Sequence, residues 1–109
     1  MIDPASGFDG VADVVISGGR IEKIGAASRP DGRVVHAAGM LVVPGLIDPH
    51  VHLREPGQEE KETIATGAAA AVAGGFTAVC CMPNTQPALD DDARIEFVYE
   101  RAESAACHV

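Results

Sequence analysis

Hydrophobic and polar positions in the first part of the chain come in short runs. Residues 12–17 are mostly apolar, Gly18-Gly19 is a two-residue hairpin signal, and residues 20–24 alternate between apolar and polar side chains. The alternation is imperfect, because Ile21 and Ile24 do not share parity. The pattern predicts two strands joined by a tight turn.

Shorter apolar runs follow at positions 34–35 and 41–43, after a turn predicted at positions 29–32. These runs predict further short strands. We expect residues 1–44 to form a small β-rich domain, a meander of short strands without chemically distinctive side chains.

A different pattern begins after Pro44-Gly45. Residues 46–53 are strand-like, and residues 59–73 have helical spacing. Three glutamates stand at the start of this predicted helix, where they would suit the positive end of its dipole, and Gly74-Gly75 would end it. The buried face of the helix is predicted to carry Ile64, Ala68, Ala71 and Val72.

A second strand and a second helix follow. Residues 76–82 are a continuous apolar run of the kind found in strands covered on both faces, and residues 83–89 are predicted to form a loop. Three aspartates at 90–92 offer caps for the helix, and residues 108–109 would begin another strand. The buried side of this helix is predicted to carry Ile95, Val98, Ala102 and Ala105 or Ala106.

The order strand, helix, strand, helix is typical of a parallel α/β sheet or barrel. A (β/α)8 barrel takes about 250 residues, and this chain has 109. We therefore expect an α/β fold with a partial small β-domain at residues 1–44 and the first two βα units of a TIM-type barrel at residues 45–109, both incomplete. A compact two-layer domain is the alternative, but it would leave both parallel strands with open hydrophobic edges.

Composition narrows the function classes. Eight lysines and arginines against sixteen aspartates and glutamates give a net charge of −8. This charge argues against a nucleic-acid partner, because phosphate neutralisation needs clustered cations. No apolar run approaches the roughly 20 residues of a membrane span. Three cysteines do not make a disulfide framework, so a reducing cytoplasm is the simpler interpretation.

The chemically informative stretch is P-G-L-I-D-P-H-V-H-L-R-E-P-G. Side chains of an extended segment alternate between faces, so Asp48, His50, His52 and Arg54 would share one face. Histidines at positions i and i+2 have Cα atoms about 6.6–6.8 Å apart, and their imidazoles can lean onto one cation. The pair alone is a weak motif, because a packed or surface role explains it equally well and further ligands would have to come from elsewhere.

Together with C-M-P-N-T-Q-P at residues 81–87, this stretch resembles the start of a dihydroorotase. Dihydroorotases belong to the amidohydrolase superfamily of metal-dependent cyclic-amide hydrolases. The similarity covers the whole chain, and the two motifs are long and specifically spaced. The resemblance therefore implies a fold, a reaction and a set of site residues.

By this resemblance His50 and His52 would be ligands of the more buried metal. Arg54 would clamp the carboxylate of the substrate, and Asn84 would bind the same carboxylate. A planar guanidinium suits bidentate carboxylate binding, and Asn84 follows the second strand, where barrel active-site loops emerge. Asp48 would either orient a histidine or Arg54, or shape the turn before the next proline.

The family reaction is the reversible cyclisation of N-carbamoyl-L-aspartate to dihydroorotate by metal-activated water, a step of pyrimidine biosynthesis. The resemblance implies one or two Zn²⁺ ions per site. The later metal ligands and the acidic proton shuttle are expected downstream of residue 109, so none of the catalytic groups is expected in this chain, and the isolated chain should be inactive. The implied partner is this small-molecule substrate, with a homodimer or a complex with aspartate carbamoyltransferase as alternative assemblies.

Two other functions stay open on the sequence alone. Allantoinases, hydantoinases and dihydropyrimidinases resemble the chain around the two histidines, but Arg54 and the P-N-T segment favour a substrate with a carboxylate. An inactive dihydroorotase-like subunit that scaffolds aspartate carbamoyltransferase is the other alternative. The presence of both His50 and His52 counts against it.

Other residues that could bear chemistry are predicted to be structural. Glu55 and residues 59–62 are interpreted as a solvated loop and helix start. Cys80 and Cys81 are interpreted as thiols of a core strand, without a cationic neighbour that would activate them.

Overall fold

The computed structural model describes residues 1–26 and 32–109. Positions 29–31 of the turn predicted at 29–32 therefore lie outside the described residues. The chain divides into two compact units, Met1–Pro44 and Gly45–Val109. Neither of the helices in the described part has the length and apolar character needed to cross a membrane.

The first unit contains two antiparallel strand pairs. β1 (Ile2–Asp3) pairs with β2 (Phe8–Asp9), and β3 (Asp13–Ser17) pairs with β4 (Arg20–Gly25). The β3–β4 hairpin was predicted. The β1–β2 pair was not, because strands of two residues are too short to show an alternation.

The β3–β4 hairpin confirms the predicted turn and explains the broken alternation that follows it. Gly18 and Gly19 have φ angles of 56° and 74°, the left-handed values that a tight two-residue hairpin requires. Ile21 pairs with Ile16, Ile24 pairs with Val14, and the register shifts between these pairs. β4 therefore carries one extra residue, and this bulge returns its two isoleucines to one face.

The strands predicted at 34–35 and 41–43 are absent from the described part of the first unit. These residues have no regular structure. The carbonyl of Val42 accepts one hydrogen bond from the Ile2 amide at 2.9 Å. An isolated bond of this kind does not build a ladder, so the predicted meander is wrong after β4.

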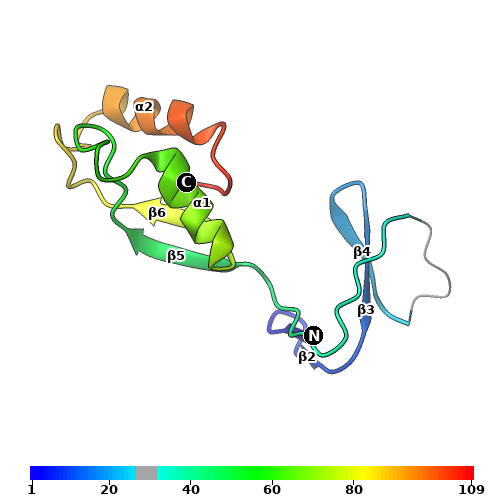
Figure 1. Ribbon diagram of the computed structural model, residues 1–109. Coiled ribbons are helices and arrows are strands. Elements are labelled where there is room, and N and C mark those ends of the chain that lie inside the picture. Colours follow the sequence, from blue (N-terminus) through cyan, green and yellow to red (C-terminus); the bar gives the residue numbers. More distant parts are fainter. Residues whose placement is uncertain (27–31) are drawn as a thin grey trace. The chain divides into compact units, whose positions relative to one another are not determined.

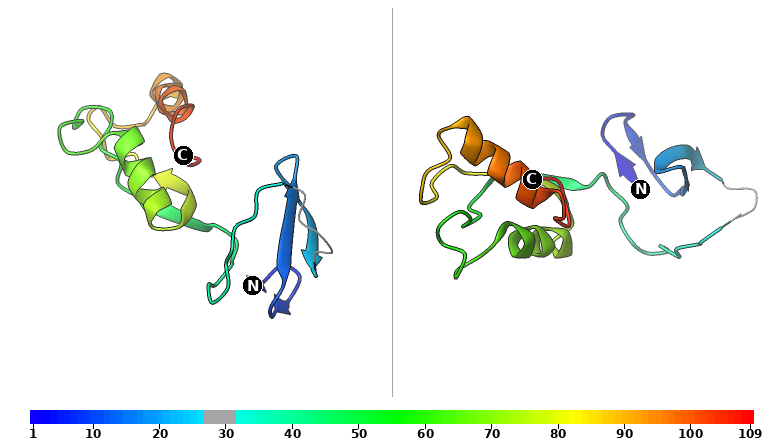
Figure 2. Two further views of the ribbon diagram at one scale, coloured as in Figure 1. Left: turned by 45° about the vertical axis from the view of Figure 1, so that its right-hand side comes forward. Right: turned by 90° about the horizontal axis from the view of Figure 1, so that it is seen from above.

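The second unit is a parallel strand pair covered by two helices. β5 (Leu46–Val51) pairs with β6 (Phe76–Cys81), and α1 (Ile64–Ala73) and α2 (Asp92–Ala102) follow them in turn. Figure 1 shows β5 and β6 side by side with α1 next to them, and Figure 2 shows the same unit from two further sides. Beyond α2, His108 makes a parallel bridge to β6, as predicted for the next strand. The buried apolar residues of this unit's core are Leu53, Ile64, Ala68, Val79 and Val98.

α1 begins five residues later than the helical spacing predicted. Thr63 caps the helix: its hydroxyl accepts a hydrogen bond from the Thr66 amide at 3.1 Å, and its own amide donates to the Thr66 hydroxyl at 2.9 Å. This reciprocal pair satisfies two backbone donors at the helix start. The glutamates at 59, 60 and 62 consequently lie before the helix, and its first turn holds no acidic side chain.

α2 begins where the aspartates predicted, but it presents a different face to the core. The Asp91 side chain accepts a hydrogen bond from the Arg94 amide at 2.9 Å, the usual arrangement of an N-cap. Val98 is buried as predicted. Ile95 is 43% exposed, however, and Phe97 packs against the core instead. The prediction of Ile95 as a core residue is therefore wrong.

Glu55, which was predicted to be solvated, is 7% exposed and bonded to both helices. One carboxylate oxygen accepts a hydrogen bond from the Ile64 amide at 2.9 Å, and the other lies 3.3 Å from Arg101 Nε. The Arg101 guanidinium also lies over the Phe97 ring, 5.2 Å from its centroid. Glu55 therefore holds the segment after β5 against the first turn of α1 and the last turn of α2.

We expect Glu55→Ala to lower the free energy of unfolding by about 2–4 kcal/mol, because a buried amide loses its acceptor and Arg101 loses its partner. Glu60→Ala, which removes the same charge from an exposed position nearby, should change it by less than about 0.5 kcal/mol. Urea unfolding of a full-length chain that contains this segment measures both values. Equal unfolding midpoints for the two variants would contradict the role of Glu55.

Candidate functional site

The candidate site lies where β5 and β6 end. Because the two strands are parallel, their carboxyl ends meet at the same edge, and the segments that follow them run side by side. The Met82 amide donates to the Val51 carbonyl at 2.8 Å, which continues the pairing to the very end of β5. This edge carries the two histidines from one strand and Asn84 from the segment after the other.

A β-bulge in β5 determines which side chains face the helices. Asp48 pairs with Val79 and Val51 pairs with Cys81, so β5 has one residue more than β6 between these two pairs. The extra residue puts Asp48 on the same side as Val51. The predicted alternation, which grouped Asp48 with the two histidines, is therefore wrong at this residue.

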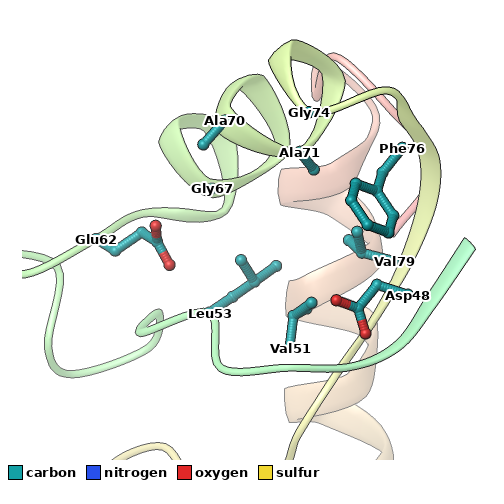
Figure 3. A pocket seen from close by; sticks show the side chains of 10 residues that line it. All are labelled: Asp48, Val51, Leu53, Glu62, Gly67, Ala70, Ala71, Gly74, Phe76 and Val79. Atoms are coloured by element: carbon teal, nitrogen blue, oxygen red, sulfur yellow. The ribbon is translucent and has the colours of Figure 1, made fainter. Parts of the chain in front are cut away.

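Figure 3 shows the Asp48 carboxylate on the same side as Val51 and Leu53, toward α1. These three residues line a cavity of about 230 Å³ between the strand pair and the helix. Asp48 Oδ1 accepts a hydrogen bond from the His50 backbone amide at 3.0 Å. Asp48 thus bonds to the backbone just beyond Pro49 and reaches His50 through the main chain.

His50 and His52 project from the opposite face, which is exposed in this chain together with Ile47; we call it the open face. The ring centroids of the two histidines are 5.2 Å apart, with their planes tilted by 59°. Two imidazoles on one tetrahedral zinc ion, each with a Zn–N bond of about 2.0–2.1 Å, have centroids roughly 5 Å apart. The pair therefore fits two positions of a metal site.

The described residues do not form a complete metal site. Among them, no group of three or more histidine, cysteine, aspartate or glutamate side chains could hold a metal ion. Imidazole is a preferred zinc ligand, but a zinc site in an enzyme normally uses three protein ligands or more. The two histidines are thus a partial donor set.

Asn84 meets His52 across the two strands. The Asn84 Oδ1 and His52 Nδ1 atoms are 2.9 Å apart, although 32 positions separate the residues in sequence. Both side chains are exposed on the same edge. The structure therefore brings together two of the residues that the sequence singled out in separate motifs.

Arg54 begins the turn that follows β5. Its carbonyl accepts a hydrogen bond from the Gln58 amide at 2.9 Å, and its side chain is half-buried. The guanidinium makes no ion pair with any residue in the described ranges. Within the described residues it is consequently a cation near the site that has no acidic partner.

Gly57, which sequence reasoning missed, brings the two site segments into contact. The Gln86 amide donates to the Pro56 carbonyl at 3.1 Å, so the segment with Arg54 is bonded to the segment with Asn84. Gly57 has a φ angle of +91°, and a Cβ atom there would lie 1.6 Å from the Gln86 carbonyl oxygen. The Pro-Gly dipeptide at the end of the motif was the available signal.

The cysteines of β6 are not part of this arrangement. Cys81 is half-buried and packs against the core, and burial raises the pKa of its thiol. Cys80 is exposed, so its interpretation as a core thiol is wrong for the chain as described. A β-strand whose second face is uncovered exposes every other residue.

Comparison with known proteins gives a consistent family. A model of the family described as dihydro-orotase-like matches residues 39–109. Dihydroorotases of Anaeromyxobacter sp. strain K and Trichlorobacter lovleyi are 59% and 50% identical to this chain, in alignments of 107 and 112 positions that cover 96% and 100% of it. The dihydroorotase of Geobacter sulfurreducens is 50% identical, in an alignment of 106 positions that covers 95% of the chain.

The fold and the site thus define an α/β chain that carries two neighbouring histidines at the carboxyl ends of its parallel strands. The chain belongs to the dihydro-orotase-like family. It spans about a quarter of the length of the relatives that it matches, because the matched part is 25%, 26% and 25% of the three proteins named above.

We expect Gly57→Ala to separate the two site segments, because the added methyl cannot coexist with the Gln86 carbonyl. Gly75→Ala is the matched control: Gly75 has a φ of +88°, but a Cβ atom there meets nothing within 4 Å. Both variants should lose about 1–2 kcal/mol of stability from the left-handed backbone. Only Gly57→Ala should accelerate hydrogen exchange at the Gln86 amide, and equal exchange in both variants would contradict the contact.

Proposed function

We propose that this chain supplies the first part of the active site of a dihydroorotase, which interconverts N-carbamoyl-L-aspartate and dihydroorotate. The named relatives are dihydroorotases at 50–59% identity. The observation that carries the proposal is the 2.9 Å contact between His52 and Asn84, because it joins the two motifs at one edge of the sheet.

The proposed fold is the start of a (β/α)8 barrel. Parallel pairing of β5 with β6, and the further parallel bridge at His108, support it. Ile47, which is 66% exposed on the open face, would be covered in the barrel interior by later strands. The Met1–Pro44 unit would be part of the small β-domain that precedes the barrel.

His50 and His52 are the proposed metal ligands, and Zn²⁺ is the proposed metal, with one or two ions per site. The spacing of the two rings supports this assignment. A bound zinc ion would activate a water molecule and polarise the amide carbonyl of the substrate. The remaining ligands and the proton-transferring acid would come from other parts of the barrel.

Arg54 and Asn84 are the proposed carboxylate-binding residues. A carboxylate offers only hydrogen-bond acceptors, and a guanidinium and an amide NH2 both offer donors. The absence of an acidic partner for Arg54 among the described residues leaves its charge available. This pair is the proposed reason that the site would prefer dihydroorotate over uncharged cyclic amides such as dihydrouracil.

In a full-length chain that contains this segment, Arg54→Ala should raise KM for dihydroorotate by about 10- to 100-fold, because a charge-assisted contact is lost. Lys61→Ala, which removes an exposed cation bonded to Gln58, is the control and should leave KM unchanged. Steady-state assays with dihydroorotate and dihydrouracil make the comparison.

Unchanged kinetics for Arg54→Ala, or faster turnover of dihydrouracil by the parent protein, would refute the assignment of dihydroorotate as substrate. A parent protein that is purified without chelators, contains no zinc and turns over neither compound would instead match an inactive scaffold subunit of aspartate carbamoyltransferase.

The isolated 109-residue chain should be inactive, because two imidazoles do not complete a catalytic zinc site. The assay is dihydroorotate hydrolysis with added Zn²⁺, and the full-length chain serves as the positive control. Turnover by the isolated chain would show that the proposed later ligands are not required.

A further inference from the structure

The chemistry of the two groups decides which of them is the donor in the hydrogen bond between His52 and Asn84. The Asn84 oxygen can only accept a hydrogen bond, and it lies 2.9 Å from His52 Nδ1. With the Asn84 oxygen in this position, Nδ1 carries the proton. In a neutral imidazole the other nitrogen, Nε2, then holds the lone pair, and a metal ion binds only a nitrogen with a lone pair.

We propose that Asn84 is a positioning residue for His52: its amide oxygen fixes the Nδ1–H tautomer and so directs Nε2 to the metal. The inference rests on the proposed function for the identity of the metal. Asn84 would thus orient a metal ligand in addition to binding the substrate carboxylate.

One amide group can serve both roles at once because its two ends differ. The oxygen is taken by His52, and the NH2 group makes no hydrogen bond to any residue in the described part of the chain. Its two N–H donors are therefore left for an acceptor such as the substrate carboxylate. Asn84 would then contact the metal ligand His52 through its oxygen and the substrate carboxylate through its NH2 group.

The position of Asn84 is itself held by the segment around it. The Gln86 amide donates to the Pro56 carbonyl at 3.1 Å, two residues beyond Asn84. The Thr85 hydroxyl donates to the Pro87 carbonyl at 2.7 Å, a bond internal to the same loop. A side chain on a loop fixed at neighbouring residues loses less entropy when it orients a ligand.

Two substitutions separate the two roles of Asn84. Asn84→Asp keeps an oxygen that accepts from Nδ1–H, but it removes the N–H donors and adds a charge that repels a carboxylate. Asn84→Ala removes both roles. Thr85→Ala perturbs the same loop without touching His52 and is the matched control.

The first experiment reads the tautomer of His52 by nitrogen-15 NMR on metal-free full-length chain in alkaline buffer, where imidazole is neutral. The parent protein, Asn84→Asp and Thr85→Ala should show Nδ1–H. Asn84→Ala should shift His52 toward Nε2–H, the tautomer that a free histidine favours. An Nε2–H signal in the parent protein, or an unchanged signal in Asn84→Ala, would overturn the proposal.

The second experiment measures Zn²⁺ affinity by competition with a chromophoric chelator. Asn84→Ala should weaken zinc binding by about 10- to 100-fold, the range found when a partner of a metal-bound histidine is removed. Asn84→Asp should bind zinc at least as tightly as the parent protein, yet lose dihydroorotate binding. Equal zinc affinity in the parent protein and Asn84→Ala would overturn the positioning role.

Neither readout depends on turnover, so the two proposals can fail separately. A full-length chain with the expected tautomers and zinc affinities that does not act on dihydroorotate would refute the proposed function alone. A chain that acts on dihydroorotate, but in which Asn84→Ala changes neither the His52 tautomer nor the zinc affinity, would refute this inference alone.

Discussion

The one-residue bulge in β5 controls which side chains reach the open face. It turns the Asp48 carboxylate toward α1, while the two histidines remain on the other side of the sheet. A carboxylate beside the histidines would repel the carboxylate of the proposed substrate and compete with it for Arg54. The bulge therefore keeps the Asp48 carboxylate away from the open face. The same carboxylate accepts a hydrogen bond from the His50 amide.

A second constraint joins the segments that follow β5 and β6. Gly57 allows the Gln86 carbonyl to approach closer than any side chain would permit, and the Gln86 amide bonds back to Pro56. Behind this contact, the buried carboxylate of Glu55 bonds to both helices. The site edge is thus held from two directions, which keeps Asn84 within hydrogen-bond distance of His52.

Sequence patterns were informative where local chemistry determines the structure. The turn at Gly18-Gly19 and the start of α2 follow from residues close together in sequence, and the order strand, helix, strand, helix predicted the parallel pairing of β5 and β6. The patterns failed at the start of α1, where the Thr63 cap was not recognised, and where strand pairing or a distant partner matters. The bulges in β4 and β5 appear only when a strand is paired, and the buried Glu55 bonds to Arg101, 46 positions further along.

His50 and His52 are the proposed ligands of one metal ion. Anomalous diffraction at the zinc absorption edge, from crystals of a full-length chain that contains this segment, tests this assignment most directly. The account predicts a zinc peak about 2.0–2.1 Å from one nitrogen of each histidine. Zinc bound elsewhere in the protein, with both imidazoles free of metal, would contradict it.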